Sequence, residues 1–185
     1  LYWIKGNNEV FDRIAAWDAG EPAPRNLHFI RNGTAVSVGP LRVAGLGGTY
    51  APKWFGTPTA ELPAARRTTS FERRDDKRRH FVREEVDACA RLGAIDILMT
   101  HEAARPFILA ADDPRAGARP RRIDAGKPAI NELLAMLRPR LHLCGHHHRF
   151  SETVREGVRS VCIDRINRSY LLIEASTLDY RLVEQ

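Results

Sequence analysis

The sequence has no apolar run long enough to cross a membrane, and no charged-then-apolar leader opens it. We therefore expect a soluble, cytoplasmic protein without a membrane partner. Cysteine is also scarce: Cys89, Cys144 and Cys162 are an odd number and lie within apolar patterns. This argues against a disulfide framework and predicts buried, reduced thiols.

The composition is that of one globular domain with a real core, because 43% of the 185 residues are hydrophobic and 28% are charged. The chain opens on Leu1 instead of methionine, and residues 1–4 read as the middle of a strand. We expect residues 1–185 to form a single domain that is the C-terminal fragment of a longer chain.

The stretch around which the chain is organised is an apolar run, residues 141–144, followed by Gly145 and three histidines. The run predicts a buried strand that ends at the glycine. Side chains two apart in an extended segment face the same way, so His146 and His148 are expected to converge while His147 points elsewhere. Such a pair suits a metal ion, and a histidine-rich surface loop is the alternative.

Two other predicted strands also end in polar residues. Asn7 and Asn8 follow the strand of residues 1–5, and His101 follows the strand of residues 95–99. Open α/β sheets bind ligands at the carboxyl ends of their strands. Asn8 is either the N-cap of the helix that follows or a site residue, whereas Asn7 has no capping role to fill.

The remaining patterns predict an α/β protein. Asn32-Gly33 predicts a tight hairpin between two short strands, and a third strand follows Gly39-Pro40. Apolar periodicity predicts helices near residues 10–19, 81–92 and 128–138, and strands of a second sheet near residues 158–163, 169–173 and 178–183. Gly47-Gly48 is either a plain turn or a point where the backbone approaches a substrate.

The net charge of +6 is concentrated in two irregular segments, residues 51–79 and 111–126. Arg73 and Arg74 lie in the first and are predicted, with Gly48, to contact substrate. Such segments either attract a polyanion such as RNA or DNA or are ordinary solvated surface.

Three motifs, Gly6-Asn7-Asn8-Glu9, Thr100-His101 and Gly145-His146-His147-His148, each follow a strand. In this order they resemble the later motifs of the calcineurin-like metallophosphoesterases. Residues 26–48 and the helix before Asp96 are similar to the RNA lariat debranching branch of that family.

The resemblance implies a four-layer αββα sandwich, with the N-terminal strands of the family absent. It implies that Asn7, His101 and His146 bind one divalent metal ion and that His148 binds a second, the ions being manganese, iron or zinc. Two such ions clamp a phosphate ester and activate a bridging water.

Asn8 stands where many members of the family carry a histidine that acts as general acid, so Asn8 and His101 are the implied catalytic residues. Asparagine cannot protonate a leaving oxygen, which favours phosphodiesters, RNA or DNA included, over simple monoesters.

One departure from the family opens a second interpretation. The family begins with an Asp-x-His motif and a Gly-Asp motif that supply further ligands, and neither precedes Gly6. The chain is therefore expected to be either a metal-dependent phosphoesterase or a non-catalytic binding module on the same scaffold. The residues do not indicate an oligomeric state.

Overall fold

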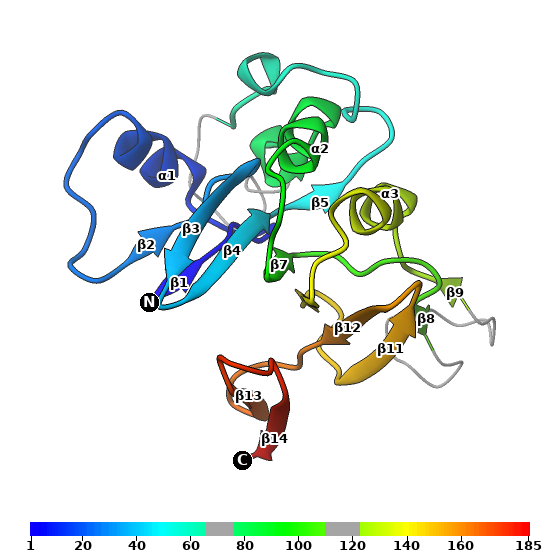
Figure 1. Cartoon of the computed structure of the whole chain (residues 1–185). Coiled ribbons are helices and arrows are strands. Elements are labelled where there is room, and N and C mark those ends of the chain that lie inside the picture. Colours follow the sequence, from blue (N-terminus) through cyan, green and yellow to red (C-terminus); the bar gives the residue numbers. More distant parts are fainter. Residues whose placement is uncertain (66–75, 110–122) are drawn as a thin grey trace.

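A six-stranded sheet forms the centre of the protein in the computed structural model, which describes residues 1–65, 76–109 and 123–185 (Figure 1). Its strands, in spatial order, are β11 (Ser151–Arg155), β12 (Val158–Cys162), β10 (Leu141–Cys144), β7 (Ile97–Thr100), β4 (Leu41–Leu46) and β3 (Thr34–Val38). The four inner strands are parallel, and each edge strand is antiparallel to its neighbour.

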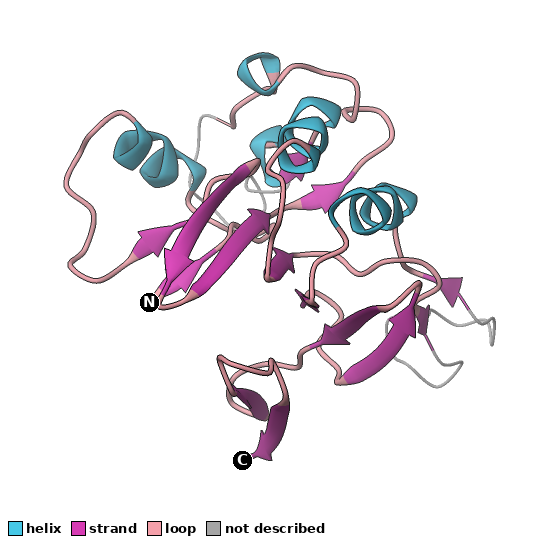
Figure 2. Cartoon of the chain, viewed as in Figure 1, coloured by secondary structure: helices cyan, strands magenta, loops and turns pink. Residues whose placement is uncertain are grey.

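Short strand pairs surround this sheet (Figure 2). They are β1 (Tyr2–Trp3) with β2 (His28–Phe29), β5 (Thr49–Tyr50) with β6 (His80–Phe81), β8 (Ile108–Leu109) with β9 (Ile123–Asp124), and β13 (Ser169–Ile173) with β14 (Tyr180–Glu184). Two single 3-10 turns, η1 (Thr59–Glu61) and η3 (Lys77–Arg79), lie in the connections.

The described α-helices are α1 (Phe11–Asp18), α2 (Arg83–Ala90) and α3 (Pro128–Leu137). Pro128 occupies the first turn of α3, where its missing amide costs no hydrogen bond. Helices α2 and α3 pack together on one face of the sheet (Figure 1). None of the helices in the described residues is long and apolar enough to cross a bilayer.

Alternation along the strands gives the sheet two buried faces. Ala44, Leu46 and Leu98 pack with α2 and α3, whereas Val43 and Ile97 belong to a second core on the opposite face. Residues of β13 and β14 close that second core. All three cysteines are buried and none of them forms a disulfide, which confirms the prediction of reduced thiols.

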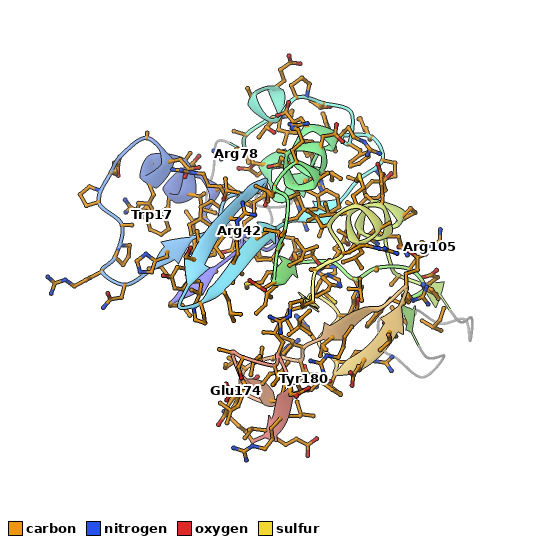
Figure 3. All side chains as sticks on the ribbon, in the orientation of Figure 1. Trp17, Arg42, Arg78, Arg105, Glu174 and Tyr180 are labelled. Carbon is orange, nitrogen blue, oxygen red and sulfur yellow. The ribbon has the colours of Figure 1, made fainter. Side chains whose placement is uncertain are left out.

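The C-terminal hairpin is attached to the sheet through Tyr180. Its hydroxyl donates to Glu152 Oε2 at 2.7 Å, and the guanidinium of Arg159 lies 5.3 Å from its ring (Figure 3). These contacts join β14 to both strands at one end of the sheet.

The mixed α/β class predicted from the sequence is confirmed, but two details of the strand pattern were wrong. The tight hairpin is at Gly39-Pro40, not at Asn32-Gly33, and β2 pairs in parallel with β1. The Asn32 side chain instead donates to Gly47 O at 3.0 Å and accepts from Gly47 N at 2.6 Å, which fixes the end of β4.

The strand of residues 158–162 was assigned to a second sheet, but it is β12 of the main sheet. Its antiparallel partner β11 was not predicted, because its exposed residues Glu152, Thr153 and Val154 do not alternate. Edge strands of this kind owe their position to pairing with a neighbour more than to a buried face.

Truncating a core side chain tests this packing. Leu133→Ala should lower the free energy of unfolding by about 2–5 kcal/mol, because Leu133 is fully buried between α3 and the sheet. Leu172→Ala, at a side chain that is 47% exposed, should cost about 0.5 kcal/mol or less. Urea denaturation of both variants measures the difference, and equal losses would contradict the assigned core.

Candidate functional site

The predicted site residues meet at the carboxyl edge of the parallel strands. Leu46, Thr100 and Cys144 are level with one another in the register of β4, β7 and β10. The backbone pairing continues beyond the ends of the strands. His101 N donates to Leu46 O at 3.2 Å, and Gly145 N donates to His101 O at 3.3 Å. The loops that carry the histidines therefore leave the sheet side by side.

Three predicted ligands form what we call the Asn-His-His cluster: Asn7, His101 and His146. Nε2 of His101 lies 3.1 Å from Asn7 Oδ1 and 2.9 Å from Nδ1 of His146. Donor atoms bound at right angles to one ion at ~2.1 Å lie ~3.0 Å apart. The two distances match both hydrogen bonds and neighbouring ligands on a single divalent ion.

Hydrogen bonds within the Asn-His-His cluster do not fully satisfy its polar atoms. Nε2 of His101 faces both an amide oxygen and a ring nitrogen, and a single imidazole N–H cannot satisfy the two acceptors fully. Burial lowers the pKa of His101 to about 3, and the neighbouring His146, His147 and His148 act in the same direction. His101 is therefore neutral at physiological pH, which is the form that binds metals.

His148 and His147 are placed differently. The backbone at His146 and His148 is left-handed, with φ of 64° and 50°, so the extended geometry from which their convergence was predicted is wrong. Nδ1 of His148 faces Arg165 instead of the cluster. His147 is buried and stacks on Phe107 with ring centroids 4.3 Å apart, so it points elsewhere, as predicted.

Asn8 does not cap α1, because Val10 occupies the N-cap position. The turn that carries Asn7 and Asn8 is closed by Glu9, whose Oε1 accepts from Gly6 N at 3.0 Å. Asn8 is exposed at the surface of this turn. The capping alternative for Asn8 is therefore wrong, and its candidate role is at the site.

Gly48 has a structural explanation. Its φ is 92°, and a Cβ there would lie 2.7 Å from Arg79 O. Its backbone N–H donates to Lys5 O at 2.8 Å, so the close approach made possible by this glycine involves the protein's own chain. Arg73 and Arg74, the other predicted substrate contacts, lie outside the described residues.

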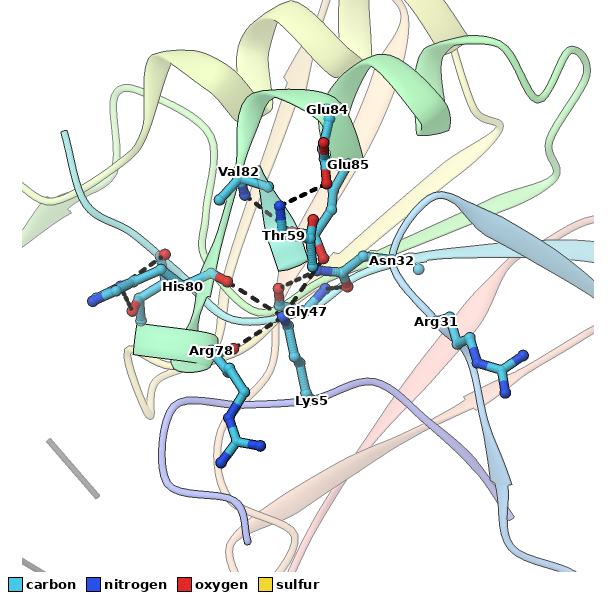
Figure 4. Close-up of polar contacts among 12 residues, drawn as sticks. Lys5, Arg31, Asn32, Gly47, Thr59, Arg78, His80, Val82, Glu84 and Glu85 are labelled. Atoms are coloured by element: carbon cyan, nitrogen blue, oxygen red, sulfur yellow. Dashed lines mark hydrogen bonds and ion pairs between the residues drawn. The ribbon is translucent and has the colours of Figure 1, made fainter. Parts of the chain in front are cut away.

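Lys5 is a buried charge that the sequence analysis did not single out. Its Nζ donates to Arg78 O at 3.0 Å and His80 O at 3.2 Å and lies 3.6 Å from Glu85 Oε1 (Figure 4). Burial lowers its pKa, and Glu85 opposes that effect. Lys5 thus fastens the segment at residues 78–80 beneath the turn that carries Asn7.

Glu102 is a buried carboxylate beside the cluster. It accepts from Tyr50 N at 2.6 Å, pairs with Lys127 at 3.4 Å, and lies 4.0 Å from Nε2 of His146. Burial raises its pKa, although Lys127 and Tyr50 oppose the shift. Glu102 is therefore held by Tyr50 and Lys127 and lies beyond hydrogen-bond distance of the His146 ring.

A buried polar chain supports the loop of His101. Thr100 Oγ1 donates to Glu102 O at 2.6 Å and so accepts from His142 Nε2 at 2.8 Å, while Nδ1 of His142 faces Ser160 Oγ at 3.0 Å. His142 has no exposed surface. The signal in the sequence was a histidine inside the apolar run 141–144.

A cavity of about 530 Å³ is lined in part by Lys5. Its apolar wall comes from Phe11, Ile14, Phe29 and Ala88. Two guanidiniums line it, but Arg31 pairs with Asp18 at 2.5 Å and Arg78 pairs with Asp76 at 2.5 Å. Because those charges are already matched, the cluster is the stronger candidate site.

Among the described residues, no group of three or more His, Cys, Asp or Glu side chains converges on one point. The Asn-His-His cluster contains two histidines and an amide, so it adds a donor of a different type. Imidazole and amide oxygen together suit manganese, iron or zinc. The described donor set therefore fits one such ion, and no carboxylate joins it.

Comparisons with known proteins define the fold. No family model matches the sequence, and no curated protein matches it. One crystal structure superposes with a TM-score of 0.65 at 11% identity, covering 99% of this chain and 65% of the other. A second, the crystal structure of TT1561 of Thermus thermophilus, has a TM-score of 0.60 at 14% identity, covering 99% of this chain and 71% of that one.

These identities establish a shared fold and nothing about activity. The chain spans less than two thirds of the first neighbour's length. The protein is a mixed α/β protein in which an Asn-His-His cluster lies at the carboxyl edge of the parallel strands.

The buried histidine makes stability depend on pH. Burial lowers the pKa of His142 to about 3, against about 6.5 for an unfolded histidine. Between these pH values only the unfolded chain binds the proton, so the stability is complete above pH 6.5 and is lost as the pH falls towards 3. His142→Gln should reduce the slope of unfolding free energy by about 1.4 kcal/mol per pH unit between pH 4 and 6.

The control is His28→Gln, at an exposed histidine of β2. Chemical denaturation across this pH range measures both slopes. An unchanged slope in the His142 variant would show that other groups determine the acid sensitivity.

Proposed function

We propose that this chain belongs to a metal-dependent phosphoesterase of the calcineurin-like type, which hydrolyses phosphodiester or phosphomonoester bonds at a dinuclear centre. The observation that carries the proposal is the convergence of Asn7 Oδ1, His101 Nε2 and His146 Nδ1 at ligand spacing. These atoms come from three separate motifs in the order of that family. The RNA lariat debranching branch is the closer candidate within it.

The layers are compatible with a four-layer αββα sandwich. Helices α2 and α3 form an outer layer on the six-stranded sheet, and residues of β13 and β14 pack on the opposite face. The pairs β1–β2 and β13–β14 are two separate two-stranded sheets, which we propose to be the remnants of the second sheet of the sandwich. In that arrangement the carboxyl edge of the main sheet is the ligand-binding edge.

The residues divide the work at the centre. Asn7, His101 and His146 would hold one ion, and His148 would hold the other, with manganese, iron or zinc as the metal. Such ions would supply Lewis-acid chemistry toward a phosphate ester and a water molecule. His101 brings a neutral ring, and the carboxylate of Glu102 lies 4.0 Å from Nε2 of His146.

Asn8 lies next to Asn7 on the exposed turn. Its amide can hold a leaving-group oxygen by a hydrogen bond, but it has no proton to transfer at neutral pH. Substrates with better leaving groups, including phosphodiesters, therefore suit the site. The basic segments around Arg73 and Arg74 favour RNA or DNA within that class.

A non-catalytic binding module is the second candidate, and one observation favours it. Within the described residues no carboxylate enters the Asn-His-His cluster, because Glu102 is held by Tyr50 N and Lys127. A site without a bridging carboxylate would hold a metal or a phosphate group without activating water.

Removing one ligand tests the proposal. His146→Ala should weaken binding of Mn²⁺ by more than about a hundredfold and abolish hydrolysis of bis(4-nitrophenyl) phosphate, because the ring supplies a direct ligand. His28→Ala, at an exposed histidine far along the chain, is the matched control. Calorimetric titration and the release of 4-nitrophenol measure the two effects.

The outcomes separate the candidates. Metal binding that depends on His146 without hydrolysis of any phosphate ester would favour the binding module. A wild-type protein that binds neither a divalent ion nor inorganic phosphate would contradict both candidates. Chelation should remove the hydrolysis, and added Mn²⁺ should restore it.

A second variant tests Asn8. Asn8→His should raise hydrolysis of phosphomonoesters with poor leaving groups relative to diesters by about tenfold or more, because an imidazole with a pKa near 6.5 can donate a proton. The ratio of kcat/KM for phenyl phosphate and bis(4-nitrophenyl) phosphate is the measurement. An unchanged ratio would place Asn8 outside the reaction.

A further inference from the structure

The loop after β12, residues 163–168, lies next to the histidine loop after β10. The two strands are parallel neighbours, and Cys162 is level with Cys144 in their register. Ile163 N continues the pairing by donating to Cys144 O at 2.8 Å. This loop therefore emerges at the same carboxyl edge as His146 and His148.

The backbone of this loop is fixed at Arg165. Its N–H donates to Asp164 Oδ1 at 2.7 Å, and its carbonyl accepts from Arg168 N at 2.8 Å and Ser169 N at 3.1 Å. Ser169 is buried at the start of β13. The exposed Arg165 side chain thus projects from a defined turn.

The guanidinium of Arg165 reaches His148. Its Nε and Nη2 lie 3.2 Å and 3.0 Å from Nδ1 of His148. A guanidinium only donates hydrogen bonds, so Nδ1 is the acceptor in this contact. Arg165 therefore contacts His148, the predicted ligand that is not part of the Asn-His-His cluster. This contact places Arg165 at the rim of the candidate centre.

Arg165 differs from nearby arginines in its electrostatic partner. Arg168 lies 3.6 Å from Asp164, and Arg159 lies 3.5 Å from Asp179. In the part of the chain that the structure describes, no carboxylate pairs with the guanidinium of Arg165, whose only side-chain partner is the ring of His148. One ring nitrogen is a weak partner for a group with five N–H donors.

We propose that Arg165 binds the phosphate group of the substrate at the rim of the metal centre, an inference that rests on the proposed phosphoesterase function. The planar fork of arginine matches two phosphate oxygens, and such charge-assisted pairs are stronger than a bond to a neutral ring. If His148 held a metal ion through its other ring nitrogen, Nδ1 would carry the proton and could not accept from Arg165. The phosphate oxygens would then be the acceptors for the guanidinium.

The experiment compares Arg165→Gln and Arg165→Lys with Arg168→Gln in the Zn²⁺-loaded protein. Arg168 is a matched control because it lies in the same loop, is 63% exposed at its side chain and pairs with Asp164. Calorimetric titration with inorganic phosphate should show binding weakened by about 10–100-fold in Arg165→Gln. Arg165→Lys should fall between this variant and the wild type, and Arg168→Gln should stay within about twofold of the wild type.

A parallel titration with Zn²⁺ tests whether Arg165 binds phosphate or instead positions His148 as a metal ligand. All three variants should bind Zn²⁺ within about twofold of the wild type, and KM for bis(4-nitrophenyl) phosphate should rise in Arg165→Gln. Loss of Zn²⁺ affinity in Arg165→Gln would make Arg165 a positioning residue for His148 and overturn the proposal. Equal loss of phosphate affinity in Arg165→Gln and Arg168→Gln would show that any positive charge in this loop has the same effect. That outcome would also overturn the proposal.

The same measurements distinguish this proposal from the one on which it rests. Wild-type protein that binds Zn²⁺ and hydrolyses the diester, with Arg165→Gln unchanged in phosphate affinity, overturns the role of Arg165 alone. Wild-type protein that binds neither Zn²⁺ nor phosphate overturns both.

Discussion

The parallel register of four adjacent strands is the constraint on which the site depends. Leu46, Thr100, Cys144 and Cys162 end their strands at one level, so the loops that follow three of these strands meet at one edge. Parallel strands need long connections, and those connections here contain α2 and α3 on one face. The helices thus close the core, and the carboxyl edge remains open for polar loops.

The loops at this edge are held in place by buried polar side chains, whose burial is unfavourable unless each is hydrogen-bonded. His142, Thr100 and Ser160 lie inside the sheet, where an unsatisfied hydroxyl or imidazole would be strongly destabilising. Each is hydrogen-bonded, and the chain of bonds ends on the backbone of Glu102. Lys5 acts similarly beneath Asn7, with two carbonyls and Glu85 compensating for its desolvation.

The chemistry of the site follows from which groups reach the edge and which do not. Two imidazole rings and an amide suit a divalent ion, whereas the carboxylate of Glu102 is directed to Tyr50 and Lys127. The proposed metal position therefore rests on two imidazoles and one amide among the described residues, and the proposed activation of water needs further ligands. The guanidinium of Arg165 contacts His148 in the neighbouring loop, which is the contact on which its proposed role rests.

Much of this could be predicted from the sequence because it depends on local pattern. Apolar runs identified β7 and β10, 3.6-residue periodicity identified α2 and α3, and polar residues after strands identified Asn7, His101 and His146. These signals are local, because the spacing of apolar residues along the chain indicates which strand or helix face is buried. The hairpin at Asn32-Gly33 failed for the same reason, because the dipeptide favours a turn without specifying which strands pair.

The sequence by itself determined the class of fold and the residue types available for a metal. Only the tertiary structure decided that Arg165 contacts His148, that His142 supports the loop of His101, and that Glu102 is held away from the cluster. It also decided the left-handed backbone at His146 and His148, which replaced the predicted extended geometry. Each of these features depends on pairing between strands distant in the chain, and that pairing is set by the packing of the whole core.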